Sequence, residues 1–203
     1  MPATKLARHA CRKARPRESG VAAVEFALLA TLFFTFVFGI IEVSRLLFVY
    51  NTLQEVTRRG AAVAVGVYPH DSGALAKVKQ TAVFRNSPGK LVLAPPITDQ
   101  NVRISYLKFD LSVIPEASWP ASAASNRQIC MVDPHAANCI RFVQVQVCAS
   151  GSSGPCEPVR SQMLLPLIDL DIPLHKATTI SRVESLGYVP GTLPPPLPPP
   201  CGC

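Results

Sequence analysis

The sequence predicts an α+β protein in which a long N-terminal transmembrane helix continues into a small domain with a second short helix and a three- to four-stranded antiparallel sheet. Three observations support this fold class. Residues 21–41 are apolar apart from Glu25, residues 42–64 continue with helical periodicity, and two later segments alternate apolar and polar residues. These patterns are typical of a membrane span, an amphipathic helix and half-buried strands, respectively. A disordered leader and a proline-rich tail complete the prediction.

Composition divides the chain into four segments. We expect a basic leader over residues 1–20, a transmembrane and amphipathic helix over 21–66, an extracytoplasmic α+β domain over 67–189, and a proline-rich tail with cysteines over 190–203. A chain of 203 residues is long enough for a membrane segment and one small domain, and for little more.

The basic leader determines the predicted orientation. Six of its residues are Lys or Arg and one is Glu18, so about +5 of the net charge of +7 lies in this segment. A basic cluster beside a membrane helix marks the cytoplasmic side, which places the domain outside the cytoplasm. Because the remaining charge is nearly balanced, we expect no nucleic-acid partner. An ordinary secretory signal is disfavoured, because the apolar run is longer than its apolar core and leads to no small-residue cleavage site.

The apolar run has the length of a membrane span, since about 21 residues in a helix cover ~31 Å. Glu25 is its one charged residue, and a charge at the bilayer centre costs about 2.5–3.5 kcal/mol on insertion scales. Two interpretations remain open. The carboxylate is tolerated near the interface, where it can snorkel, or it pairs with an ammonium group. Cleavage after Gly20 would create that ammonium on Val21, on the same chain or a neighbour.

The junction between the leader and the helix has a specific pattern. Gly20 is followed by VAAVEFALL, so that Glu25 is the fifth residue after the glycine and the aromatic Phe26 comes next. This junction resembles the class III leader of type IV pilin-like proteins. Together with a set of later helix residues, it makes the stretch from about 17 to 65 resemble the TadE-like family of pseudopilins, from the tight-adherence (Flp) pilus assembly systems of bacteria. The later residues are Glu42, Arg45, Asn51, Gln54, Arg59 and Gly60.

The resemblance implies how the chain is processed. In that family a membrane-bound aspartyl prepilin peptidase cuts after the glycine at the cytoplasmic face. Gly20–Val21 would then be the scissile bond, and Glu25 the acidic residue of the motif. The chain would be the substrate of this enzyme and not an enzyme itself.

The resemblance also implies a location and a set of partners. The protein would be a minor pseudopilin anchored in the bacterial inner membrane, with its N-terminus in the cytoplasm and its C-terminal domain in the periplasm or outside the cell. Expected partners are the membrane, the prepilin peptidase, other pilins or pseudopilins, and the pilus assembly machinery of an adhesion system. The alternative is an unprocessed, single-pass periplasmic scaffold or binding protein in the same membrane.

Beyond the membrane span, apolar and small residues recur at three- and four-residue steps, which predicts one stripe of a helix. This stripe packs on the chain's own domain, on a partner pseudopilin, or on both along different turns. Gly66 and Pro69 end the helix, and Asp71 or Ser72 caps a second helix over about 72–85. The stripe comprises Leu46, Tyr50, Leu53, Thr57, Gly60, Ala61 and Ala64.

Three segments are strand candidates. Residues 101–110 and 140–148 alternate apolar and polar side chains, and residues 173–184 are rich in Thr, Ile and Val. The apolar block 163–170 contains a proline and is either an edge strand or a loop over the core. Residues 111–138, rich in Pro, Ala, Ser and Asn, are expected to form a surface loop.

Six cysteines follow the helix, on the side of the membrane where disulfides persist. Pairing in sequential order would join Cys130 to Cys139 and Cys148 to Cys156 through the shortest loops, although the sequence alone leaves other pairings open. Cys201 and Cys203 are too close to pair comfortably with each other. They end a proline-rich arm that is either a spacer or a ligand for another envelope component.

No catalytic or cofactor-binding pattern is present in the sequence. Cys130, His135 and Cys139 match no compact zinc spacing, and their compartment favours oxidation. There is no G-x-S-x-G, H-E-x-x-H or P-loop motif. We therefore expect no metal, no cofactor, no small-molecule substrate and no enzymatic activity.

Overall fold

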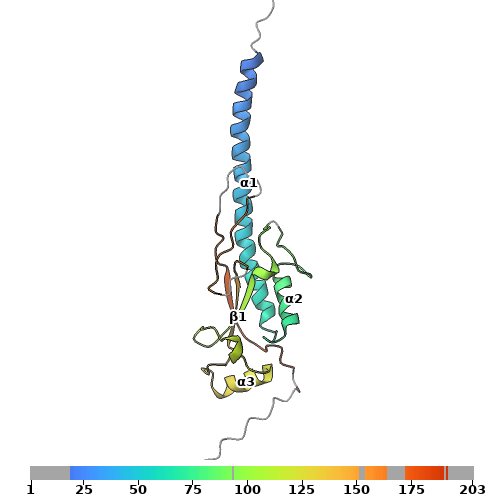
Figure 1. Ribbon diagram of the computed structural model, residues 1–203, viewed down its shortest axis with the longest axis vertical. Coiled ribbons are helices and arrows are strands. Elements are labelled where there is room, and N and C mark those ends of the chain that lie inside the picture. The colour runs from blue at the N-terminus through green and yellow to red at the C-terminus, as the bar shows by residue number, and fades with distance from the viewer. Residues whose placement is uncertain (1–18, 93, 151–153, 164–171, 190, 192–203) are drawn as a thin grey trace, which may run out of the picture. The chain divides into compact units, whose positions relative to one another are not determined.

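The computed structural model describes residues 19–92, 94–150, 154–163, 172–189 and 191 (Figure 1). The leader up to residue 18, the block 164–171, and most of the tail with Cys201 and Cys203 lie outside the described residues. The chain divides into two units, Met1–Ile41 and Glu42–Cys203. The predicted fold class is confirmed, since a long N-terminal apolar helix precedes further helices and a three-stranded antiparallel sheet.

The first helix, α1 (Ser19–Ala64), is long because no helix breaker interrupts its sequence. It ends just before Gly66 and Pro69, as expected. The second helix, α2 (Ser72–Ala82), begins where the Asp71 carboxylate accepts a hydrogen bond of 2.8 Å from the amide of Ala74. This cap satisfies an amide that would otherwise lack a partner at the helix start.

The sheet has the order β1-β2-β3, with β1 (Val102–Leu107), β2 (Phe142–Val147) and β3 (Thr178–Arg182) all antiparallel. The alternation predicted for β2 is present, because Val143, Val145 and Val147 are buried while the residues between them are half-exposed. The facing residues of β1 continue this apolar face, with Val102 opposite Val147. One face of the sheet therefore forms part of the core.

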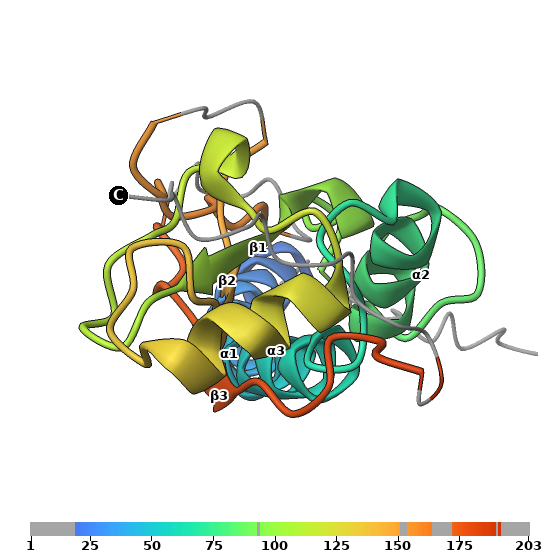
Figure 2. The same cartoon turned by 90° about the horizontal axis from the view of Figure 1, so that it is seen from below.

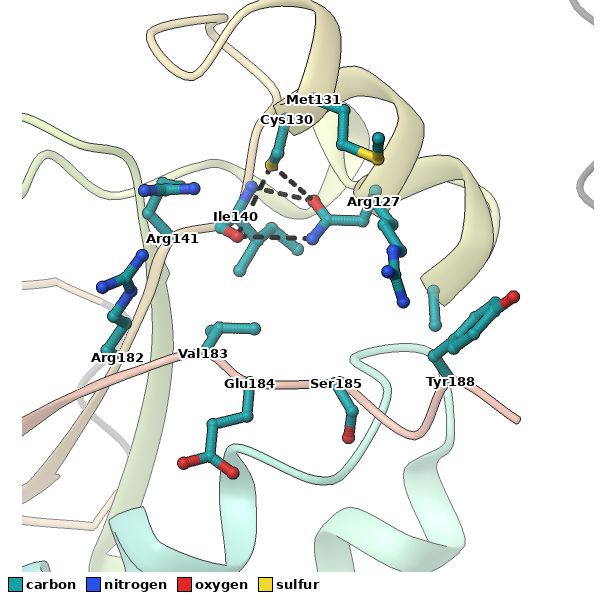
Figure 3. Close-up of a pocket in the computed structure, with 12 residues that line it drawn as sticks. Arg127, Cys130, Met131, Ile140, Arg141, Arg182, Val183, Glu184, Ser185 and Tyr188 are labelled. Atoms are coloured by element: carbon teal, nitrogen blue, oxygen red, sulfur yellow. Dashed lines mark hydrogen bonds between the residues drawn. The ribbon is translucent and has the colours of Figure 1, made fainter. Parts of the chain in front are cut away.

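The expectation of a surface loop over 111–138 was wrong for part of that range. It contains the short 3-10 helix Glu116–Ser118 and the helix α3 (Ala123–Val132). Ser122 caps α3 by accepting a hydrogen bond of 3.0 Å from Ser125. Asn126 then accepts from the amide of Ile140 at 2.9 Å and donates to its carbonyl at 3.3 Å, bonds drawn at Ile140 in Figure 3. A cap and a tertiary anchor stabilise a helix whose own apolar periodicity is weak.

The core of the second unit joins α1, α2, β1 and β2. It includes Leu53 and Val56 of α1, Val78 of α2, and Tyr106 and Val143 of the sheet. Figure 1 shows α2 and the sheet beside the C-terminal turns of α1, and Figure 2 shows α3 in the same unit from below. The C-terminal part of α1 is therefore an integral helix of the domain.

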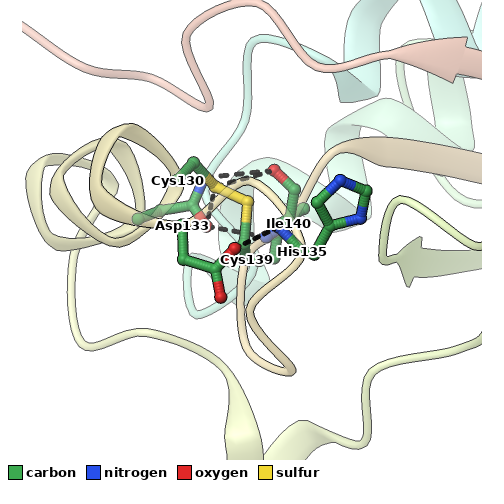
Figure 4. The surroundings of a disulfide bond; sticks show 6 residues. Cys130, Asp133, His135, Cys139 and Ile140 are labelled. Carbon is green, nitrogen blue, oxygen red and sulfur yellow. Dashed lines mark hydrogen bonds between the residues drawn. A yellow bond between two sulfur atoms is a disulfide. The ribbon is translucent and has the colours of Figure 1, made fainter.

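Among the described cysteines, disulfides join Cys130 to Cys139 and Cys148 to Cys156, which are the two sequential pairs considered above. Figure 4 shows the first one at the end of α3, beside His135. Each closes a short loop and contributes about 2–3 kcal/mol in a loop-closure estimate. Because Cys130 and Cys139 are joined, neither supplies a thiolate ligand for zinc.

Candidate functional site

The first part of α1, from Gly20 to Ile41, presents its side chains to the surroundings. Its residues are exposed except Ala30 and Val37, which are half-buried. By length and composition this helix can cross a membrane. A helix that exposes large apolar side chains on all sides is suited to lipid, or to contact with other helices within lipid.

Polar groups in this apolar part fall into two kinds. The hydroxyl of Thr31 donates to the carbonyl of Ala27 at 2.8 Å, and that of Thr35 donates to Thr31 at 2.8 Å. These groups are satisfied inside the helix, as hydrocarbon requires. Glu25 differs, because its exposed carboxylate makes no hydrogen bond or ion pair with any residue that the structure describes. The Glu25 carboxylate is therefore the charged group in this part of α1 that another molecule can bind.

The predicted processing site lies in the first turn of α1. Gly20 is exposed, and a Cβ added there would meet no atom within 4 Å. The fold therefore makes no steric demand for glycine at this position. Amides in the first turn of a helix lack intrahelical partners, so the Gly20–Val21 bond lies where unwinding loses few hydrogen bonds.

The second part of α1 begins with a buried ion pair. Arg45 donates to the Glu42 carboxylate at 2.7 Å, and the two residues are only 8% and 6% exposed. The same guanidinium donates to the carbonyl of Gln162 at 2.8 Å, across 117 residues of sequence. Buried charges are stable only when they are paired and hydrogen-bonded. The pair therefore fixes the segment around Gln162 to the helix.

Between Tyr50 and Thr57, the helix contacts the segment that leads into β3. The side chain of Gln54 lies 2.5 Å from Nε2 of His175, and the His175 ring stacks on Tyr50 with centroids 5.1 Å apart. Thr57 and Thr179 share a hydroxyl–hydroxyl bond of 2.9 Å. These polar contacts set the position of β3 along the helix.

Near its C-terminal end, α1 approaches its neighbours closely. A Cβ added at Gly60 would lie 3.1 Å from Val145 and 3.3 Å from Ala82, which is tighter than ordinary van der Waals contact. The absence of a side chain at Gly60 thus permits α2 and the sheet to meet here. Arg59 lies over the ring of Phe84, 4.9 Å from its centroid.

Of the six helix residues singled out in the sequence, five contact the chain's own domain and Asn51 is exposed. The structure shows that the stripe packs on the chain's own domain, and packing on a partner pseudopilin along other turns stays a prediction. Sequence reasoning missed Val49 and Val56, which are buried beside Leu53. Their three- and four-residue spacing from Leu53 was a usable signal. No signal was available for Gln162 or His175, because they come from distant parts of the chain.

The helix motif contains no arrangement suited to metal chemistry. Within the described residues, no group of three or more His, Cys, Asp or Glu side chains could hold a metal ion. The residues of α1 instead divide this helix into a first part with exposed apolar side chains and a second part that packs in the domain.

The comparisons with known proteins bear on this helix. Residues 20–62 match the family model described as TadE-like protein, which confirms the resemblance over these residues and associates the chain with tight-adherence pilus systems. The matched residues include Gly20, Glu25 and the whole set of helix residues from Glu42 to Gly60. No curated protein and no solved structure matches the chain.

Proposed function

We propose, from the TadE-like helix over residues 20–62, that this protein is a minor pseudopilin of a tight-adherence pilus system, anchored in the bacterial inner membrane. The observation that carries the proposal is the division of α1. Its first part exposes apolar side chains and Glu25, while its second part packs in the domain. The first part is therefore available on all sides to a bundle of pilin helices, whereas the second part offers only its outer face, with Val43 and Leu47 exposed. The role is structural, and the chemistry of maturation belongs to a partner enzyme.

Maturation proceeds by removal of the basic leader. A prepilin peptidase cuts the Gly20–Val21 bond at the cytoplasmic face, and Val21 gains a free ammonium group. Glu25 lies four positions after Val21, a spacing that places both on one face of the helix. In the low dielectric of lipid their attraction is strong, whether the partner ammonium is on the same chain or a neighbouring pilin.

The domain lies on the periplasmic side. The positive charge before the helix supports this orientation, since basic flanks remain in the cytoplasm. The two disulfides fit it as well, because such bonds persist in oxidising compartments.

Cleavage is tested with a pair of glycine variants. An added Cβ meets no atom within 4 Å at Gly20 or at Gly39, so neither substitution disturbs the fold. On co-expression with an active prepilin peptidase, we expect Gly20→Ala to remain unprocessed on a gel and Gly39→Ala to mature normally. Normal processing and normal pili in the Gly20→Ala strain would favour the unprocessed scaffold instead.

The membrane carboxylate is tested after cleavage. Glu25→Gln retains the size of the side chain but removes its charge, so we expect normal leader removal and a loss of piliation of about tenfold or more. Pilus counts by electron microscopy, normalised to mature protein in the membrane, give the readout. Full piliation by this variant would exclude the carboxylate from assembly.

A further inference from the structure

A cavity of about 260 Å³ lies between α3 and the segment that follows β3 (Figure 3). Three arginines from separate parts of the chain line it. Arg127 belongs to α3, Arg141 directly precedes β2, and Arg182 ends β3. The fold thus brings together three positive charges that lie far apart in the sequence.

These charges have no counter-charge in the structure. Among the described residues, none of the three guanidinium groups forms an ion pair or donates a hydrogen bond. Glu184 supplies the only carboxylate among the lining residues, and in Figure 3 it points away from the arginines. Like charges that line one cavity repel each other, so a bound anion would stabilise this arrangement.

Defined contacts hold the side chain of Arg127 and the backbone around Arg141 in place. Arg127 lies over the ring of Tyr188, 5.2 Å from its centroid. The backbone of Arg141 is held on both sides, since its amide donates to Leu107 at 2.9 Å and its carbonyl accepts from Val183 at 2.9 Å. The Cys130–Cys139 disulfide closes the loop between α3 and β2. A site whose groups are already ordered loses less entropy when a ligand binds.

We propose that this cavity binds an acidic segment of a partner protein, with two carboxylate side chains separated by apolar residues. Figure 3 shows Arg141 and Arg182 at one end of the cavity and Arg127 at the other, with Ile140 and Val183 between them. The guanidinium group matches a carboxylate through paired hydrogen bonds. An extended peptide can contact both ends and also cover the apolar residues Ile140 and Val183, for which a phosphate has no apolar group. The proposal concerns the domain alone and does not depend on leader processing.

The test uses the full chain in detergent micelles and a fluorescent peptide in which two leucines separate two glutamates. The cavity variant carries Arg127→Gln, Arg141→Gln and Arg182→Gln. The matched control carries Arg58→Gln, Lys77→Gln and Lys176→Gln, which removes the same charge from exposed positions outside the cavity. By fluorescence anisotropy we expect the cavity variant to bind about tenfold more weakly or worse, and the control to stay within about twofold of the unaltered chain.

Thermal unfolding separates a binding role from a structural one. Removal of like charges that repel each other should offset the loss of the Arg127–Tyr188 contact and leave the melting temperature close to that of the unaltered chain, whereas arginines needed for folding would lower it strongly on removal. If the triple variant fails to fold, the single variant Arg182→Gln replaces it, because it alters an exposed residue. We expect this single variant to bind the peptide about threefold more weakly. Absence of saturable binding, equal losses in the cavity and control variants, or displacement by inorganic phosphate as effective as by unlabelled peptide would overturn the proposal.

Discussion

The two parts of α1 have the same secondary structure but differ in composition and in how far their leucines are buried. Leu32 in the first part is 57% exposed, whereas Leu53 in the second part is 1% exposed. The second part also holds a buried ion pair, while Glu25 of the first part has no partner among the described residues. A single helix can thus combine two roles. Its first part offers a surface to other molecules, and its second part, which begins at Glu42, packs in the core of the domain.

The largest expected effect comes from breaking the buried pair at this boundary. Arg45→Met leaves the Glu42 carboxylate without its 2.7 Å partner in a buried site. We expect the free energy of unfolding to fall by about 3–5 kcal/mol. Denaturant unfolding in detergent measures this, with Arg58→Met at an exposed position as control. Equal unfolding midpoints for the two variants would show that the pair contributes nothing.

A matched pair of leucines compares the two parts directly. Leu53→Ala removes a fully buried side chain and should cost about 2–5 kcal/mol of domain stability. Leu32→Ala removes an exposed side chain of the same size and should leave the unfolding midpoint of the domain unchanged. If Leu32→Ala destabilised the domain as much as Leu53→Ala, the division of the helix would be refuted.

Two glycines provide a finer comparison. Gly60→Ala places a methyl group 3.1 Å from Val145 and should cost about 1–3 kcal/mol through overpacking. Gly39→Ala meets nothing and should be neutral, or slightly favourable through helix propensity. Thermal melts of both variants give the readout, and a stabilising Gly60→Ala would mean that the contact is loose.

The smallest effect concerns the core on which the second part of α1 rests. The Tyr106 hydroxyl is buried, and no described residue serves as its hydrogen-bond partner. Burial, and to a lesser extent Tyr68, raises the pKa of Tyr106 above its ordinary value near 10. As pH rises past about 10 the unfolded chain loses this proton first, so the domain is fully stable below that pH and loses stability above it.

Tyr106→Phe should remove this dependence. We expect a gain of about 1 kcal/mol at neutral pH, because an unsatisfied buried hydroxyl is deleted, and a smaller loss between pH 7 and about 11. Urea midpoints at the two pH values measure both quantities. A variant less stable at neutral pH would indicate that the hydroxyl has a partner such as a bound water.

Much of the fold could be predicted because its signals are local. The ends of α1, the Asp71 cap of α2 and the alternation of β2 all depend on neighbouring residues. By contrast, α3 depends on the hydrogen bonds between the Asn126 side chain and the backbone of Ile140. Sequence periodicity does not predict such a contact. Local sequence patterns therefore predict the helices and strands with strong periodicity. Whether a helix with weak periodicity forms depends on its tertiary contacts.

The candidate site shows the same limit. Glu42 and Arg45 were identified by family resemblance, yet their burial depends on Gln162, which lies 117 residues from Arg45. The arginine cavity was not predicted at all, since Arg127, Arg141 and Arg182 line one cavity only because tertiary contacts hold α3 beside the segments that flank β2 and β3. A cluster of charged residues from distant segments of the chain has no local sequence pattern that would predict it.

The central claim is that the exposed part of α1 enters assembly with a new N-terminus beside Glu25. The most direct measurement is the intact mass and N-terminal residue of the protein purified from membranes that contain an active prepilin peptidase. We expect a chain that begins at Val21 with a free amine. A chain that still begins at Met1 in the same membranes would contradict the claim.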